Sequence, residues 1–185
     1  MKRIIQIVLA AAVMTVVGCK EKKQSDDIIT TRNEIVVPQA SGPVRMQEYQ
    51  QTKQVNWVGR TYTVDIKRMA NDSLALVKDE TGQSFVDNSI SLRIVRADGS
   101  VFFSKTFTKQ SFSDYLDEAY RQRGILEGLV FDKVDGNNLV FAASVSFPQT
   151  DEYIPLEVKV DNFGHVGIKR DENLDTYGND DLDSE

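Results

Sequence analysis

Apolar and polar residues alternate along much of the chain from Val58 onward. In the first such stretch Val58, Tyr62, Val64 and Ile66 share one face, while Thr, Asp and Lys occupy the positions between them. An alternation of period two predicts half-buried β-strands, because successive side chains of a strand point to opposite sides. The pattern predicts more strands around Leu74 and Leu76, over 125–134, 139–147 and 154–160, and at Val166 and Ile168.

The clearest local signal is a β-hairpin around Asp98-Gly99. This dipeptide is typical of a two-residue type I′ turn. Opposed residues then have numbers that sum to 197, so the expected pairs are Ile90 with Phe107, Leu92 with Lys105, and Ile94 with Phe103. A slip of one residue would bring apolar residues opposite polar ones, so the pattern specifies the register.

One helix is predicted at about 111–123. Its apolar residues follow helical spacing, and they are Phe112, Tyr115, Leu116, Ala119 and Tyr120. Ser111 is a good N-cap, and Gly124 follows the basic last turn. The predicted fold is mainly β (α+β), an antiparallel sheet of seven to eight strands arranged as a sandwich or a curved half-barrel.

The N-terminus has the pattern of a lipoprotein signal peptide. Lys2 and Arg3 precede an apolar run, and Val16-Val17-Gly18 leads to Cys19, the single cysteine of the chain. The run is shorter than the ~20 residues that a membrane span needs. We therefore expect a signal peptide over 1–18, lipid on Cys19 as the membrane anchor, and an exported protein held at the outer membrane on its periplasmic or cell-surface face.

Composition divides the rest of the chain into three parts. Residues 19–54 are polar and lack sustained periodicity, which predicts a tether, although Ile35-Val36-Val37 has the character of a short strand. The β-rich domain is expected over 55–170. Residues 171–185 contain seven acidic side chains and no Lys or Arg, so they are expected to form an acidic tail.

Charge bears on the class of partner. Removal of the leader shifts the formal net charge from −6 to −8, and the tail carries most of it. Nucleic acid recognition requires a basic stripe, so the composition argues against a nucleic acid partner.

The residues needed for common catalytic chemistry are scarce. His165 is the only histidine, it falls in a predicted turn, and a zinc site needs three or four ligands. The carboxylates of Asp151-Glu152 point to opposite faces of a strand, which does not suit glycoside hydrolysis. Alternate Asp and Asn in the tail resemble the start of an EF-hand loop, but Thr176 replaces the turn glycine. We expect no catalytic residues, no cofactor and no metal site, with calcium binding by the tail left open.

Four residues are candidates for facing a ligand. The hairpin register turns Lys105 inward between Phe103 and Phe107, where a cation either lines a cleft or protects an edge strand from pairing. Trp57, Phe102 and Tyr153 fall off the main core faces. They either stack on a sugar or cover a second small core.

Several stretches resemble a domain-of-unknown-function family of Bacteroidota-type lipoproteins. The resemblance covers about Val58 to Thr176 and rests on the segments 87–90, 96–103, 107–109, 124–132, 141–145, 148–156 and 168–171. It implies an exported, lipid-anchored, β-rich domain and supplies no activity.

These observations lead to three functional hypotheses. The first is a non-enzymatic, lipid-anchored domain that binds a protein or glycan ligand. The second is a structural accessory subunit of an envelope complex, and the third is a glycan-acting hydrolase. A binding domain predicts a concave face with exposed aromatic residues, a structural subunit predicts a large flat apolar patch, and a hydrolase predicts two carboxyl groups in one cleft.

Overall fold

The computed structural model describes residues 42–172, which contain ten β-strands and two short helical segments. The first sheet has the order β1-β2-β5-β6, and its strands are β1 (Tyr49–Trp57), β2 (Arg60–Ala70), β5 (Asn88–Arg96) and β6 (Val101–Phe107). The second has the order β10-β9-β8-β7, and its strands are β7 (Ile125–Asp135), β8 (Asn138–Ser146), β9 (Tyr153–Asp161) and β10 (Val166–Arg170). The two-residue strands β3 (Val77–Lys78) and β4 (Ser84–Phe85) form a small separate hairpin.

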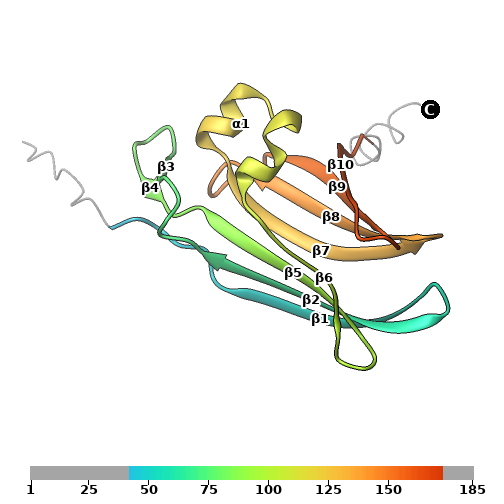
Figure 1. Ribbon diagram of the computed structural model, residues 1–185. Helices are drawn as coiled ribbons and strands as arrows, with labels where there is room; N and C mark the ends of the chain where they lie inside the picture. The colour runs from blue at the N-terminus through green and yellow to red at the C-terminus, as the bar shows by residue number, and fades with distance from the viewer. Residues whose placement is uncertain (1–41, 173–185) are drawn as a thin grey trace, which may run out of the picture. The chain divides into compact units, whose positions relative to one another are not determined.

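The two sheets face each other around one hydrophobic core (Figure 1). Most of their inward apolar side chains are almost fully buried, among them Ile66, Leu92, Phe141 and Val158 at 0 % exposure. All strand pairs within the sheets are antiparallel, and the sheets do not close into a barrel. The predicted mainly β, antiparallel fold is therefore confirmed, and it takes the open form with two sheets.

The helix predicted at 111–123 is wrong in detail. A 3-10 segment η1 (Lys109–Tyr115) and a short helix α1 (Glu118–Arg123) are separated at Leu116, which is extended with φ −106° and ψ 139°. The break lets both Phe112 and Leu116 enter the core. The Arg121 guanidinium donates to the carbonyls of Leu116 at 2.6 Å and Ser113 at 3.3 Å, so it satisfies groups near the break.

The β5–β6 hairpin has the predicted register but not the predicted turn. Ile90 pairs with Phe107, Leu92 with Lys105, and Ile94 with Phe103, as the pattern predicts. Only Gly99 has positive φ, +84°, whereas a type I′ turn needs two such residues. The turn instead closes with Gly99 N–H donating to the Arg96 carbonyl, and an irregularity between Ile94 and Val95 absorbs the shift.

A type I′ geometry does occur, at Val58-Gly59 between β1 and β2. Val58 has φ +45° and Gly59 has φ +75°, while Trp57 pairs with Arg60 across the turn. The prediction that Val58 shares a strand face with Tyr62 was wrong, because Val58 lies in the turn and is 43 % exposed. A β-branched residue at positive φ is strained.

Two boundaries differ from the sequence pattern. β1 begins at Tyr49, inside the segment predicted as a tether, and Val44 already forms a bridge to Phe85. The strand predicted at Leu74 and Leu76 is displaced to β3, and Leu76 is 51 % exposed. The tether of 19–54 therefore overlaps the domain over the residues that the structure describes.

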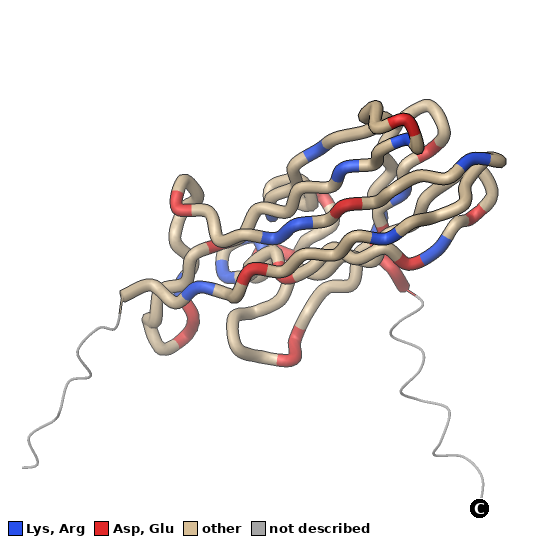
Figure 2. The backbone as a smooth tube through the Cα atoms, turned by 90° about the horizontal axis from the view of Figure 1, so that it is seen from below, with Lys and Arg blue, Asp and Glu red and all other residues tan. Residues whose placement is uncertain are grey.

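Figure 2 shows that basic and acidic positions are interspersed over the described part of the chain. Neither sign forms a continuous stripe along the strands in this view. Ion pairs between the two signs, such as Lys159 with Asp135 at 2.9 Å, account for part of this mixing.

Candidate functional site

The candidate site lies where side chains of the first sheet, and that of Asp87 just before β5, bond to the backbone of β7, the edge strand of the second sheet. Leu126 N–H donates to Asp87 Oδ1 at 2.8 Å, and the Leu126 carbonyl accepts from Asn88 Nδ2 at 2.9 Å. Arg68 donates to the Glu127 carbonyl, and Phe131 N–H donates to Gln51 Oε1 at 3.1 Å. An edge strand exposes unpaired backbone groups, and here polar side chains bind them instead of another strand.

A cavity of about 500 Å³ lies beside these contacts, and we call it the Arg68 cavity. Its walls come from both sheets and from the β8–β9 loop. The main lining residues are Tyr49 and Arg68 of the first sheet, Glu127, Val130 and Tyr153 of the second, and Asp151 of the loop. This volume falls within the range of ~300–1,000 Å³ that is typical of ligand sites.

Arg68 is the central cation of this cavity. Its guanidinium donates to the Gln47 carbonyl at 3.0 Å in addition to Glu127, and it lies 5.9 Å from the Tyr49 ring centroid. Burial lowers the pKa of Arg68 from its usual value, although the Glu127 carboxylate opposes this. Its Nε is buried without a hydrogen-bond partner among residues 42–172.

The remaining walls combine aromatic rings with oxygen acceptors. Tyr153 is 49 % exposed and Tyr49 is 38 % exposed, so both residues remain accessible to a ligand. Ser144 Oγ donates to Glu127 Oε2 at 3.3 Å, which orients that carboxylate. Exposed rings beside carboxylates and hydroxyls offer both a stacking surface and hydrogen bonds to a ligand rich in hydroxyl groups.

Among the predicted ligand-facing aromatics, only Tyr153 lies in this cavity. Trp57 is 1 % exposed and packs edge-on against Tyr62 at 5.1 Å and Phe102 at 5.4 Å. Phe102 is half-buried in the same cluster, with Arg96 5.1 Å above its ring. The prediction that Trp57 faces a ligand is therefore wrong, because on β1 Trp57 faces the main core and not solvent.

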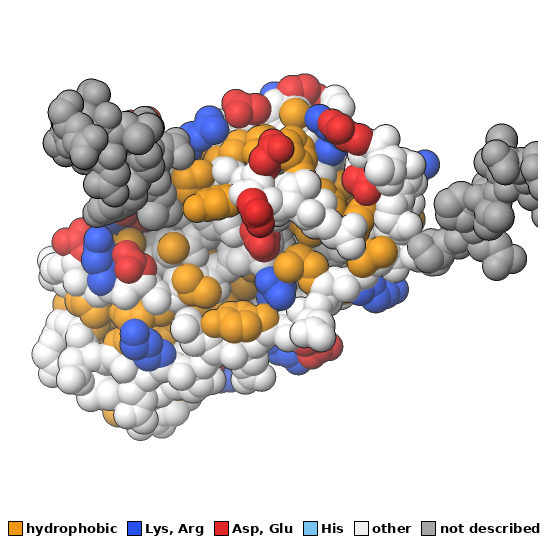
Figure 3. All heavy atoms as spheres, turned by 180° about the vertical axis from the view of Figure 1, so that it is seen from behind, with side chains coloured by type: hydrophobic (Ala, Val, Ile, Leu, Met, Phe, Trp, Pro, Cys, Tyr) orange, Lys and Arg blue, Asp and Glu red, His pale blue; other side chains and the backbone are white. Residues whose placement is uncertain are grey.

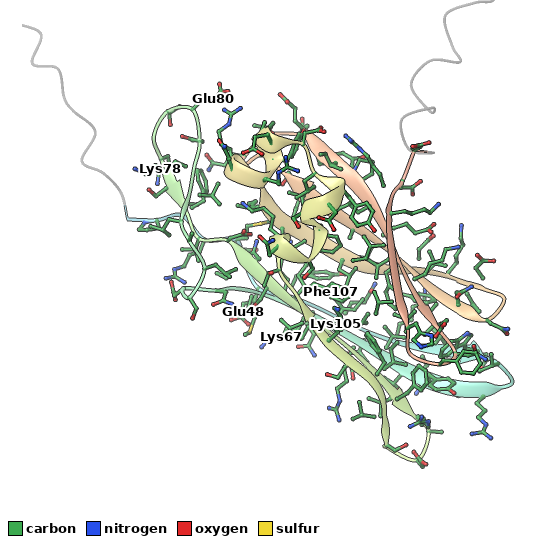
Figure 4. The ribbon with its side chains drawn as sticks, turned by 45° about the horizontal axis from the view of Figure 1, so that its top comes forward. Glu48, Lys67, Lys78, Glu80, Lys105 and Phe107 are labelled. Carbon is green, nitrogen blue, oxygen red and sulfur yellow. The ribbon has the colours of Figure 1, made fainter. Side chains whose placement is uncertain are left out.

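Lys105 lies on the edge strand β6, opposite Leu92 as the register predicts. It is exposed, and its Nζ lies 5.5 Å from the Phe107 ring centroid (Figure 4). Lys105 is not part of the Arg68 cavity. This position agrees better with a charge that protects an edge strand than with a cation in a cleft.

Sequence reasoning missed a buried polar cluster at Asp87, Asn88 and Lys109. Asp87 Oδ2 lies 3.7 Å from Lys109 Nζ, and Lys109 also donates to the Gly124 carbonyl at 2.6 Å. Burial raises the pKa of Asp87, although its backbone hydrogen bonds and the nearby Lys109 act to lower it. Burial also lowers the pKa of Lys109. The cluster borders a cavity of about 270 Å³ and connects β5, β7 and η1. Its sequence signal is weak, since polar residues commonly flank strands.

The remaining predicted features fall mostly outside this region. Cys19, the signal peptide and nearly all of the acidic tail lie outside the described residues. Among residues 42–172 no helix is long and apolar enough to span a membrane, and no group of three His, Cys, Asp or Glu could hold a metal ion. His165 is an exposed residue of the β9–β10 turn, with Nδ1 2.9 Å from Asp161 Oδ2.

Comparison with known proteins gives one result. Residues 28–168 match the model of a family described as a domain of unknown function (DUF4738). No curated protein matches the chain.

Proposed function

The chain belongs to the DUF4738 family of domains of unknown function, and we propose that it is a lipid-anchored domain that binds a glycan in the Arg68 cavity. The anchor is supported by the Val16-Val17-Gly18-Cys19 pattern. The attachment of lipid to this cysteine would place the binding domain at an envelope surface, where glycans are abundant. The family match adds no activity to this argument.

The observation that carries the proposal is the clustering of exposed apolar side chains in the cavity. Nine large apolar residues are exposed in the described part of the chain, and three of them, Tyr49, Val130 and Tyr153, line this one cavity. Viewed from behind, apolar side chains gather across the middle of the molecule with charged side chains among them (Figure 3). A concave site with exposed rings favours a binding domain over a structural subunit with a flat apolar patch.

The polar lining favours a hydroxyl-rich ligand. Glu127, Asp151 and Ser144 present oxygen acceptors, and Arg68 presents donors, within the walls that hold the two tyrosine rings. Sugar rings have apolar faces and polar edges, which suits such a combination. A mainly apolar ligand would take the carboxylates of Glu127 and Asp151 out of water without offering them hydrogen bonds, at a cost in free energy.

A second candidate follows from the same cavity. Glu127 and Asp151 both line it, and a pair of carboxyl groups in one cleft is what glycoside hydrolysis uses. Glu127 accepts from Ser144 and is half-buried, while Asp151 is exposed. The chain would then cleave the glycan that it binds.

A glycan array followed by calorimetry tests the proposal. We expect wild-type protein to bind at least one glycan, and Tyr153→Ala to weaken that binding about tenfold, which corresponds to about 1.4 kcal/mol. Phe163→Ala is the matched control, because Phe163 is a 79 % exposed aromatic residue in a turn outside the cavity.

Absence of binding to every glycan, or equal affinity of the two variants, would refute the assignment of this site. Release of reducing ends by the wild type that Glu127→Gln abolishes would establish the hydrolase instead. Binding without cleavage would support a non-enzymatic domain.

A further inference from the structure

Three cavities adjoin along the loop between β8 and β9. The Arg68 cavity is one of them, and Thr150 of this loop lines all three. A cavity of about 320 Å³ has apolar walls from Val44, Phe85 and Ile125 and shares Glu127 with the Arg68 cavity. A cavity of about 400 Å³ lies against the β3–β4 hairpin and shares the loop residues 147–150 with the apolar cavity.

We propose that these cavities form one extended groove that holds several consecutive units of a polysaccharide chain. The inference rests on the proposed glycan-binding function and specifies its ligand as a polymer. Each cavity has a volume suited to a small ligand portion, and shared lining residues place each next to another. A single sugar would occupy only one of the three.

The far end of the groove has its own polar contacts. Glu80 lies at the tip of the β3–β4 hairpin (Figure 4), and its Oε1 is 2.7 Å from Arg123 Nη1. Arg123 also lies 5.1 Å from the ring centroid of Phe147, at the start of the loop. The groove thus has polar contacts with an aromatic residue at both ends and apolar walls between them.

The loop that forms the shared wall has a strained backbone. Gln149 has φ +61°, which is uncommon for a residue other than glycine. Gln149 lines both the apolar cavity and the far cavity and is exposed. Strained residues are held by their surroundings and are frequent at ligand sites, which agrees with a binding role for this wall.

The charges of the groove select a neutral polymer. Five carboxylates line the three cavities, against three arginines, and the carboxylates are Asp79, Glu80, Glu127, Asp151 and Glu152. A polyanionic glycan would meet net repulsion in such a groove. Neutral chains meet acceptors for their hydroxyl groups instead.

Calorimetry with oligosaccharides of increasing length tests the inference. The probes are three neutral series, the cello-, malto- and N-acetylchito-oligosaccharides, each from the monosaccharide to the hexasaccharide. We expect one series to bind, with an affinity that rises with length by about tenfold or more from the disaccharide to the hexasaccharide. Glu80→Ala should remove most of that rise and leave disaccharide binding unchanged, whereas Tyr153→Ala should weaken both.

Asp114→Ala is the matched control for Glu80→Ala, because Asp114 is an exposed acidic residue outside all three cavities. Affinity that is independent of length, or a Glu80→Ala variant that behaves like the control, would overturn the extended groove and leave the single-cavity function standing. Failure of wild-type protein to bind any oligosaccharide, together with an empty glycan array, would overturn both.

Discussion

Removal of the Asp87 side chain is expected to destabilise the domain strongly. Asp87 Oδ1 accepts the backbone N–H groups of Asn88 and Leu126, each at 2.8 Å, and Oδ2 lies near Lys109 Nζ. Its side chain is only 5 % exposed. In Asp87→Ala two buried N–H groups lose their acceptor, and the Lys109 ammonium loses its counter-ion while it keeps the Gly124 carbonyl. Strand β7 and η1 thereby lose a common attachment next to β5.

The magnitude follows from the groups left without partners. A buried backbone N–H without a partner costs about 1–3 kcal/mol, and loss of one member of a buried ion pair costs about 3–5 kcal/mol. Because Asp87 borders an open cavity, water can reach part of the vacated site, which favours the lower end. We expect Asp87→Ala to lower the free energy of unfolding by about 3 kcal/mol. Asp87→Asn retains an acceptor and should cost about half as much.

Urea denaturation is a suitable assay, since Trp57 is the single tryptophan and is 1 % exposed, so its fluorescence reports on unfolding. Asp135→Ala is the matched control, because Asp135 bonds to Lys159 at the surface, and it should leave stability nearly unchanged. An Asp87→Ala variant as stable as that control would refute the reasoning. Equal losses in Asp87→Ala and Asp87→Asn would show that the backbone acceptor role is not what matters.

The pH dependence of the same variants has a defined sign. Burial raises the pKa of Asp87, so its contribution to stability is fully present below about pH 4 and is lost as pH rises through the raised pKa. The stability advantage of the wild type over Asp87→Asn should therefore shrink from pH 4 toward neutrality. Burial lowers the pKa of Lys109, so the advantage over Lys109→Met should grow as pH rises toward about 10.4.

Three further predictions concern the turns and the anchor. Val58→Asn should raise the free energy of unfolding by about 1 kcal/mol, because Asn tolerates positive φ better than a β-branched residue. Val101→Asn, at a similarly exposed valine, should bring no such gain, and thermal melting of the two variants measures the difference. Gly99→Val should lower the free energy of unfolding by on the order of 1–3 kcal/mol, and the cause is the positive φ alone, since a Cβ there meets nothing within 4 Å. Gly167→Val, also with open space but without positive φ, should cost less stability. An unchanged melting temperature of Gly99→Val would contradict this. Cys19→Ala should leave the protein soluble or uncleaved on fractionation, and tight membrane association after cleavage elsewhere would count against lipid as the anchor.

The hairpin shows which part of the fold the sequence pattern determines. Alternation fixes the register of Ile90, Leu92 and Ile94 against β6, because a slip of one residue would expose every apolar side chain of the strand. The turn itself carries no such constraint. Asp98-Gly99 suits more than one geometry, and an irregularity next to Ile94 accommodates the turn that forms while the pairs below it stay in register.

The helix prediction was wrong because the same apolar pattern fits either one continuous helix or two short helical segments. The spacing of Phe112 and Leu116 fits one face of a continuous helix, and both residues are buried. Burial is also achieved by a broken segment, which needs a partner for the carbonyls at the break. Arg121 supplies that partner, and its role as a donor to Leu116 and Ser113 is invisible in a pattern that counts only apolar positions.

The strand that the pattern missed leads to the candidate site. On β1 only Val55 and Trp57 follow the inward alternation, while Gln51, also inward, is polar and bonds to Phe131 of the other sheet. Arg68, inward on β2, bonds in the same way to Glu127. The apolar alternation thus ends where polar side chains, and not apolar packing, join the sheets, and the Arg68 cavity lies at that place. A local departure from the rule that one strand face is apolar is expected at functional sites. The polar residues that concealed the beginning of β1 are therefore themselves an argument for a ligand at this edge of the sandwich.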